Sequence, residues 1–193
     1  MLIKGVPLAT KSRSLRERPA LVAGRVGGVN KPTPVTLGAF AGYSFPIFAS
    51  DDEECFFRNS VPRRWDGITN PTFTILMWLT SAETIGKKFD FQLSWNKVTP
   101  TATAAIATAT VIDVLTGDIT LTDDNNDQYK IHSHTYTIDL DHATLISNLA
   151  GGDDLVMRLR RVQNSAGAGS EITGEVVLFD WYITYQVDRV FSA

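Results

Sequence analysis

The chain has 193 residues, of which 44% are hydrophobic and 20% charged, and its formal net charge at pH 7 is −3. These values are typical of one globular domain with an appendage, and the near balance of charge excludes a general polyanion mimic or nucleic-acid binder. No apolar run reaches the roughly 18 residues of a membrane-spanning helix. The single cysteine, Cys55, excludes an intrachain disulfide framework and a cysteine-rich zinc site.

Basic residues and prolines are concentrated at the start of the chain. Residues 1–64 carry ten Lys or Arg against five Asp or Glu, and they hold six of the eight prolines. Within 1–34 neither a helical nor a strand period persists, so we expect an extended basic arm that gains its shape on a partner protein. No aromatic residue precedes Phe40, which does not favour nucleic-acid binding by base stacking. The predicted partner-binding residues are Lys4, Lys11, Arg13, Arg16, Arg18, Arg25 and Lys31.

Short alternating runs follow the basic segment. The clearest is Phe89–Asn96, in which every second residue is apolar, the period of a strand with one wet face. Glu175–Val187 repeats this period and places on one face Val177, Phe179, Trp181, Ile183, Tyr185 and Val187. We expect further strands at Val35–Phe48, Thr72–Leu79, Thr101–Leu115, Tyr129–Leu140 and Asp154–Val162.

Turn-forming residues separate these runs at Thr116–Asp118, Asp123–Asp127 and Ser165–Gly169, and only Asp141–Leu149 favours a helical turn. About seven to nine short strands, with turns roughly every ten residues, indicate an all-β antiparallel β-sandwich of the jelly-roll type. We therefore expect an extended basic N-terminal arm at 1–34, a linker or edge strands at 35–64, and the jelly-roll β-sandwich at 65–193.

A series of strand endings marks the region 65–187. A Trp-Asp-Gly and Asn-Pro lead-in at 65–71 precedes an aromatic strand that ends at Trp78, and a second aromatic strand ends at Trp95. A Gly-Asp turn at 152–154 leads into the arginine-bearing strand 155–161, and a final strand covers 176–185. This pattern resembles small jelly-roll modules of tailed-bacteriophage virion proteins. The resemblance implies a decoration, fibre or receptor-binding part, assembled in many such modules as a homotrimer.

The search for chemical motifs predicts no catalytic residue and no cofactor, because neither a nucleophile elbow, a zinc-protease helix motif nor a phosphate-binding loop is present. His132 and His134 would project from one face of a strand and are weak candidates for metal ligands; the alternative is a pair of half-exposed strand residues. Asp123–Asp127 offers oxygen ligands for calcium, but it lacks the glycine and distal glutamate of an EF-hand loop, which favours a solvated hairpin tip.

Two charged clusters each allow a structural and a functional interpretation. The four acids of Asp51–Glu54 predict a solvated loop or, alternatively, a patch that receives the basic arm of a neighbouring subunit. A thiolate at the adjacent Cys55 is disfavoured by this charge, so we do not expect a nucleophile there. Arg158, Arg160 and Arg161 either bind an anionic group or, as we favour, form pairs within or between subunits.

Four exposed tryptophans could together form a platform on which sugar rings stack, so we consider where each tryptophan lies in its strand or loop. Trp95 and Trp181 fall on the apolar faces of their strands and Trp78 shares a face with Leu76, so we expect these three to be buried. Trp65, in a loop after two arginines, is the one expected to be exposed.

These observations predict a non-enzymatic virion structural protein, made in the host cytoplasm and acting as a capsid decoration or cement protein. Its expected partners are the major capsid protein or other virion proteins, together with its own copies in a homotrimer. We do not expect it to bind a membrane. One alternative is a trimeric tail or fibre component that binds a host surface glycan, which predicts an exposed aromatic groove. Another is a standalone carbohydrate-binding module, which predicts a monodisperse protein that works without any particle.

Overall fold

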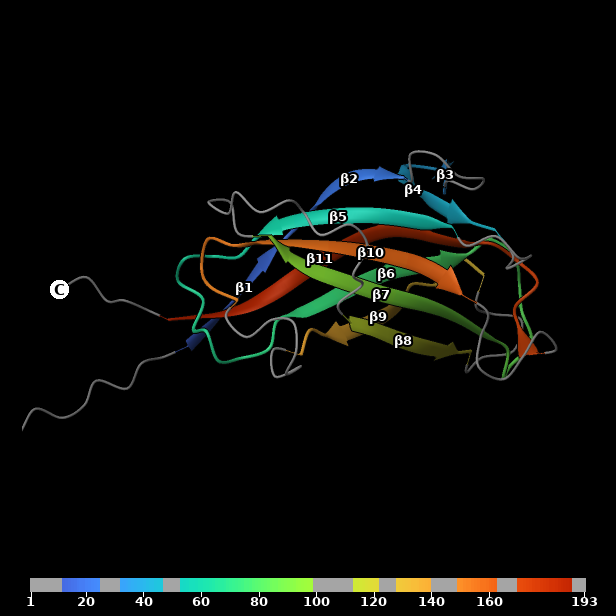
Figure 1. The fold of residues 1–193 in the computed structure, drawn as a ribbon. Coiled ribbons are helices and arrows are strands. Elements are labelled where there is room, and N and C mark those ends of the chain that lie inside the picture. Colours follow the sequence, from blue (N-terminus) through green and yellow to red (C-terminus); the bar gives the residue numbers. More distant parts are fainter. Residues whose placement is uncertain are drawn as a thin grey trace, which may run out of the picture.

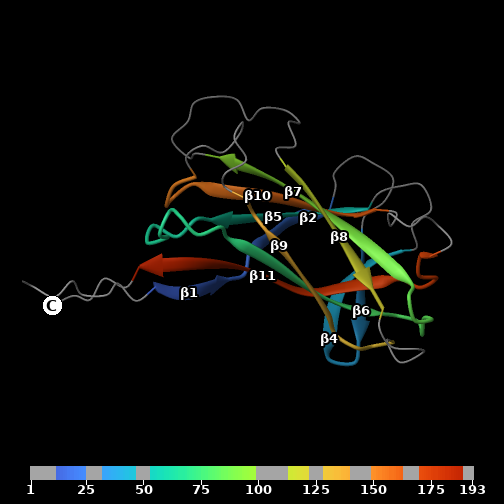
Figure 2. The same cartoon turned by 90° about the horizontal axis from the view of Figure 1, so that it is seen from below.

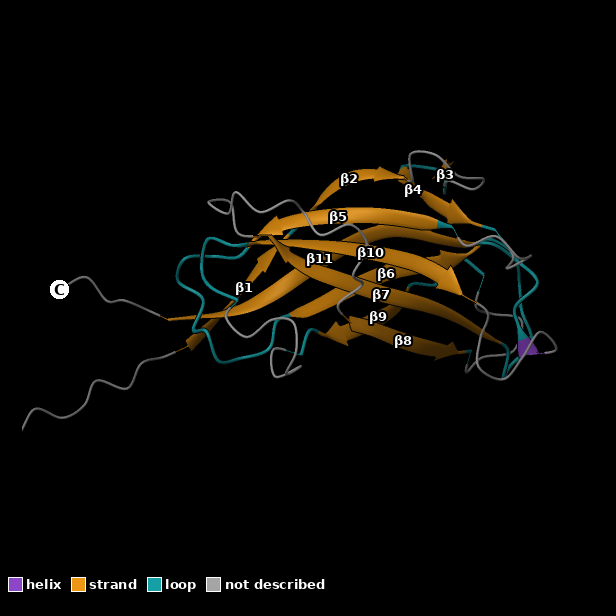
Figure 3. Cartoon of the chain, in the orientation of Figure 1, coloured by secondary structure: helices purple, strands orange, loops and turns teal. Residues whose placement is uncertain are grey.

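The computed structural model describes residues 12–24, 32–46, 53–98, 113–121, 128–139, 149–162 and 170–188. Strands dominate these ranges, and Figure 3 shows them arranged in two layers. Their bounds are β1 Ser12–Glu17, β2 Ala20–Gly24, β3 Thr33–Leu37, β4 Phe40–Phe45, β5 Glu54–Ser60, β6 Thr72–Leu79, β7 Lys88–Val98, β8 Asp113–Thr120, β9 His132–Thr137, β10 Asp154–Val162 and β11 Val176–Asp188.

The strands form two antiparallel sheets that pack face to face (Figure 1). The first sheet has the order β3-β4-β11-β6-β9, with β1 also paired to β11, and the second has the order β2-β5-β10-β7-β8. The predicted all-β antiparallel sandwich is confirmed. Eight of these strands, β4 to β11, form the sheets β4-β11-β6-β9 and β5-β10-β7-β8. Counted from β4 as the first strand, these orders are 1-8-3-6 and 2-7-4-5, which is the strand order of a jelly roll.

The core lies between the sheets and is rich in aromatic side chains. The apolar face of β7 is buried as its alternation predicts, with Phe89, Phe91 and Leu93 each 0% exposed. Phe45 of β4 meets Phe91 edge to face with ring centroids 5.0 Å apart, which links the two sheets. Each such side chain contributes about 1.5–3 kcal/mol through burial, so the alternating pattern fixes which face of each strand turns inward.

A β-bulge in β11 changes the face predicted for part of that strand. The register of β11 against β6 shifts between Leu178 and Asp180. Trp181 belongs to the core, as predicted, whereas Phe179 packs against Trp78 at 5.1 Å, away from the core cluster. The extra residue of a bulge reverses the alternation on one side of it, so Val177 and Phe179 do not share the face of Trp181.

The described part of the basic segment is not a free arm. Strand β1 pairs with β11 from Ser12↔Asp188 to Glu17↔Ile183, and β2 pairs with β5. Figure 2 shows β1 lying along β11. Because β5 and the end of β11 would otherwise have backbone groups without strand partners on one side, β1 and β2 can complete the sheets without an alternating sequence of their own.

The sandwich therefore begins earlier than the predicted residue 65. Strands β4 and β5, which fall within 35–64, belong to the eight-strand roll. Of the strands in this range, only β3 is an edge strand of the kind expected there. Thr116–Asp118, predicted to be a turn, lies within β8 instead, paired with Asp90–Gln92 of β7. Asp123–Asp127, Ser165–Gly169 and nearly all of Asp141–Leu149 lie outside the described residues.

In the part of the chain that the structure describes, no helix is long and apolar enough to cross a membrane.

Candidate functional site

A notch lies beside β11 in the first sheet, between the ends of its neighbours β4 and β1. On one side of β11 the ladder of β4 ends at Leu178, and that of β1 begins only at Ile183. Between β1 and β2 the chain passes through Arg18 and Pro19 to the second sheet. The space of about 380 Å³ left beside β11 is lined by Arg18, Pro34, Val35, Thr36, Ala41, Gly42, Tyr43, Phe179 and Trp181.

Trp181 forms the fixed inner wall of the notch. Its side chain is 6% exposed, and its indole Nε1–H donates to the carbonyl oxygen of Pro19 at 2.8 Å. The Tyr43 ring lies 6.4 Å from the Trp181 ring at an interplanar angle of 50°. Phe57 of the second sheet supports the same indole from behind at 5.1 Å. The aromatic wall is therefore held in place before any ligand binds.

Arg18 lines the notch and pairs with Asp180 of β11. The Arg18 guanidinium carbon lies 4.8 Å from the centroid of the Trp181 ring, and Nη2 lies 3.2 Å from Oδ1 of Asp180. The two side chains are 62% and 40% exposed. The arrangement presents N–H donors and carboxylate acceptors to solvent beside an aromatic wall, which suits a ligand that has hydroxyl groups and an apolar face.

Gly42 allows the hairpin of β3 and β4 to close the far side of the notch. A Cβ at this position would lie 2.7 Å from the carbonyl oxygen of Leu178 and 2.7 Å from Cγ1 of Val177. The close approach of β4 to β11 therefore requires glycine at residue 42.

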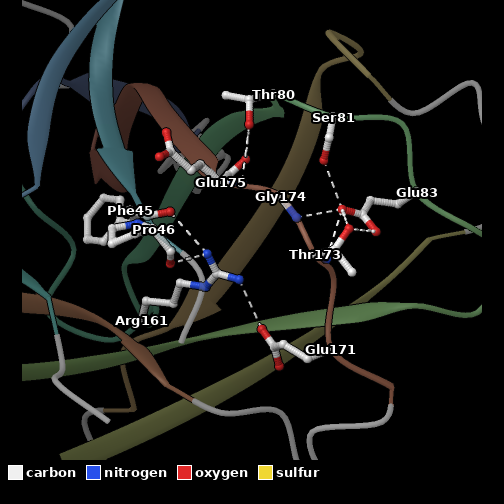
Figure 4. Close-up of polar contacts among 10 residues, drawn as sticks. All are labelled: Phe45, Pro46, Thr80, Ser81, Glu83, Arg161, Glu171, Thr173, Gly174 and Glu175. Carbon is white, nitrogen blue, oxygen red and sulfur yellow. Dashed lines mark hydrogen bonds and ion pairs between the residues drawn. The ribbon is translucent and has the colours of Figure 1, made fainter. Parts of the chain in front are cut away.

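A second polar cluster lies between the two sheets at the end of β10 (Figure 4). The Arg161 guanidinium is 2% exposed and donates to the carbonyl oxygens of Phe45 and Pro46. It also pairs with Oε1 of Glu171 at 3.0 Å. This one side chain thus connects β10 with the end of β4 and with the segment before β11.

Glu83 closes the neighbouring loop through a different set of contacts. Its Oε1 accepts from the amides of Thr173 and Gly174 at 2.9 and 2.6 Å, and from the hydroxyl of Ser81 at 2.9 Å. The Glu83 side chain is 3% exposed, so these donors replace water around the carboxylate. We assign it a structural role.

Glu53 is the remaining buried carboxyl of this region. It is 6% exposed, and its Oε2 has no hydrogen-bond partner among the described residues. Burial raises the pKa of Glu53 to about 7, against the lowering effect of Arg161 and with a smaller raising effect of Glu175. The carboxyl therefore changes charge near neutral pH.

The predicted solvated loop at Asp51–Glu54 is corrected for its second half. Glu53 and Glu54 are buried, and Glu54 pairs with Arg158 at 3.4 Å. Asp51 and Asp52 lie outside the described residues. Burial, with Glu54 nearby, raises the pKa of the Cys55 thiol well above its ordinary value, in agreement with the expectation that Cys55 is not a nucleophile.

The predicted pairing of the β10 arginines within the chain is confirmed. Arg158 reaches Glu54 and the hydroxyl of Ser94, and Arg160 donates to Oε1 of Gln92. Asp154, at the start of the same strand, pairs with Arg58 of β5.

The weak metal candidates, His132 and His134, are half-buried on one face of β9, as the spacing of two residues predicts. The His134 ring packs on Tyr136 at 4.6 Å, and burial lowers the pKa of His134. Among the described residues, no group of three or more His, Cys, Asp or Glu side chains is arranged to hold a metal ion.

The predicted burial of three tryptophans is confirmed, but the predicted exposure of Trp65 is wrong. Trp78, Trp95 and Trp181 are buried as expected, but Trp65 is also only 8% exposed. Its indole donates to the carbonyl of Thr69, because the loop folds back over it around Asp66. A four-tryptophan stacking platform is therefore excluded.

Of the predicted partner-binding residues, the structure describes three. Arg18 lines the notch, Arg16 stacks over the Tyr182 ring at 4.6 Å, and Arg13 is exposed on β1. Lys4, Lys11, Arg25 and Lys31 lie outside the described residues. Arg16 and Arg18, which the sequence assigned to a foreign surface, thus contact aromatic side chains of their own sandwich. The notch itself has no local sequence signal, because residues from both ends of the chain form it.

No protein-family model and no curated protein matches this chain. A solved structure of TmCBM61 in complex with beta-1,4-galactotriose is similar to it with a TM-score of 0.31 and 7% sequence identity, covering 74% of this chain and 69% of that chain. At these values the similarity carries no argument about the site.

Proposed function

We propose that this chain is a recognition module without catalytic activity that binds a saccharide in the notch beside β11. The observation that supports it is the exposed Arg18–Asp180 pair, in which Arg18 lines the notch beside the packed Trp181 and Tyr43 rings. A sugar ring carries hydroxyl groups around its rim and C–H groups on its faces. Both parts find a complementary surface in this notch.

The Arg18–Asp180 ion pair favours an uncharged saccharide. Asp180 already balances Arg18 at 3.2 Å, so an anionic sugar would have to displace a carboxylate that is held by the same chain. Two neighbouring hydroxyls can instead bind the pair as it stands, one accepting from the guanidinium and the other donating to the carboxylate.

The size of the notch limits the ligand. About 380 Å³ lies within the range of small-molecule sites and admits a short oligosaccharide end or one to two sugar rings. Preorganisation lowers the entropic cost of binding, because Trp181 and Tyr43 are already packed.

A glycan array probed with the full chain tests this proposal. We expect binding to a restricted set of neutral glycans, with at least a tenfold loss in Arg18→Ala and in Asp180→Ala. The matched control is Arg13→Ala, which removes an exposed arginine of β1 outside the notch and should bind as the parent does. Absence of binding to every glycan, or equal binding by all three variants, would contradict the proposal.

A second candidate is a structural protein of a tailed-phage virion, as a decoration, cement or fibre component. It is favoured by the tip of the β3–β4 hairpin, where Leu37 and Phe40 are 36% and 62% exposed, directly opposite one another. Paired apolar side chains on a projecting tip suit contact with a neighbouring subunit or another virion protein.

Because residues 12–24 lie on their own sheets, this second function would use the hairpin as an anchor in place of those residues. We expect the full chain to form a homotrimer or to incorporate into particles, and Phe40→Ser to reduce either. A monomer that enters no particle would contradict the virion role and would leave the saccharide proposal standing.

A further inference from the structure

Arg161 occupies a position from which it can hold or release the end of β4. Its guanidinium donates to the Phe45 and Pro46 carbonyls, which end β4, and it is balanced by Glu171 at 3.0 Å. Figure 4 shows these contacts converging on one side chain. Since the arginine is buried, its contacts with Phe45 and Glu171 are made without competition from water.

Several carboxyl groups surround the single Arg161 guanidinium. Glu53 is the residue directly before β5. Its backbone carbonyl oxygen accepts a hydrogen bond from the Arg161 backbone amide at 3.1 Å. Its side chain is 94% buried with Oε2 unpartnered among the described residues. The described charged groups that surround Glu53 and Arg161 are Glu54, Glu83, Lys88, Glu171 and Glu175.

We propose that Glu53 is the proton-dependent control of a latch in which Arg161 holds the end of β4 against β10. With Glu53 neutral, Arg161 is shared between Glu171 and the two carbonyls. When Glu53 ionises, a second buried carboxylate competes for the guanidinium and needs water. The contacts with Phe45 and Pro46 then weaken, and the end of β4 loosens.

The direction with pH follows from the environment of Glu53. Its pKa is raised to about 7 from an ordinary 4.5, chiefly by burial, so the closed latch binds the proton more tightly than the open one. Closure is therefore most stable below about pH 4.5, and it is lost progressively as the pH rises through about 7. The latch does not depend on saccharide binding, and its test uses the ligand-free protein.

Hydrogen exchange of the full chain measures the latch directly. After correction for the intrinsic rate, we expect the protection of the Tyr43–Phe45 amides to fall roughly thirtyfold between pH 5.5 and 8, as a carboxyl with these two pKa values requires. The amides of Leu93 and Leu159, paired at the centre of the second sheet, are the internal control and should not change.

Glu53→Gln keeps the shape of the side chain but cannot ionise, so its Tyr43–Phe45 amides should stay protected at pH 8. A carboxyl carbon NMR titration of Glu53 in the unmodified chain gives a second readout that needs no variant. A midpoint near 4.5, or the same pH dependence in Glu53→Gln as in the parent, would overturn the latch.

Discussion

The guanidinium of Arg18 lies 4.8 Å from the centroid of the Trp181 ring, which joins the beginning of the chain to its last strand. The neighbouring carbonyl of Pro19 accepts from the same indole. The N-terminal residues therefore form a wall of the candidate site and do not only cover a sheet edge. This relationship makes the site sensitive to changes far from β11 in sequence.

Replacing Arg18 by Ala should affect stability little. An exposed cation–π contact contributes about 0.5–1 kcal/mol, and an exposed ion pair contributes less than about 1 kcal/mol. We expect urea unfolding of Arg18→Ala to show a loss of at most about 1 kcal/mol. A loss above about 3 kcal/mol would mean that Arg18 is chiefly a structural residue, and that the binding loss expected for this variant reflects unfolding.

Removing Arg161 should destabilise the fold strongly. Arg161→Met removes the ion pair of the buried Glu171 with Arg161, and breaking one side of such a buried pair costs about 3–5 kcal/mol. The measurement is the free energy of unfolding in urea. Arg161→Met combined with Glu171→Leu removes both charges and should recover part of the loss. If Arg161→Met alone were neutral, the guanidinium would not be the connection between β4 and β10 that we describe.

Gly42→Ala tests the close approach of β4 to β11. The added methyl would lie 2.7 Å from a backbone oxygen that cannot rotate away, so we expect a loss of about 1–3 kcal/mol. Ala41→Ser adds one atom at the exposed neighbouring position and should stay within about 0.5 kcal/mol of the parent. Equal stability of the two variants would show that the hairpin has room to move.

Asp154 predicts a pH effect of opposite sign to that of Glu53. Hydrogen bonds from Ser60 and Arg58 lower the pKa of this carboxyl below its ordinary 3.8. The unfolded chain therefore takes up the proton first as the pH falls, and stability is lost below about pH 4. Unfolding measured between pH 2 and 6 should show a shallower acid loss in Ser60→Ala than in the parent. An unchanged slope would contradict this assignment.

Regular alternation allowed much of the fold to be predicted. Phe89, Phe91 and Trp95 of β7 lie in the core as their spacing requires, and Trp181 does so within β11. These residues follow a local period that burial on one face enforces. The bulge beside Leu178 could not be predicted, because it adds one residue without a mark in the sequence.

The candidate site could not be predicted, because pairing partners distant in sequence create it. Arg18 was identified as a binding residue, but its aromatic partner and Asp180 are near the other end of the chain. Glu54 belongs to a run of four acids that is typical of a solvated loop. It is nevertheless buried, because the ion pair with Arg158 offsets the cost of removing its charge from water. Trp65 is buried because the Asp66 turn folds over it, a tertiary arrangement that loop composition does not indicate.

The central claim is that the notch beside β11 binds a saccharide, and an NMR titration of the full chain with the best glycan from the array tests it most directly. The account predicts saturating shifts of the Trp181 indole N–H and the Gly42 amide, with the Trp95 indole unchanged as the buried control. Saturating shifts that leave Trp181 and Gly42 unmoved, and that cluster elsewhere on the sandwich, would contradict it.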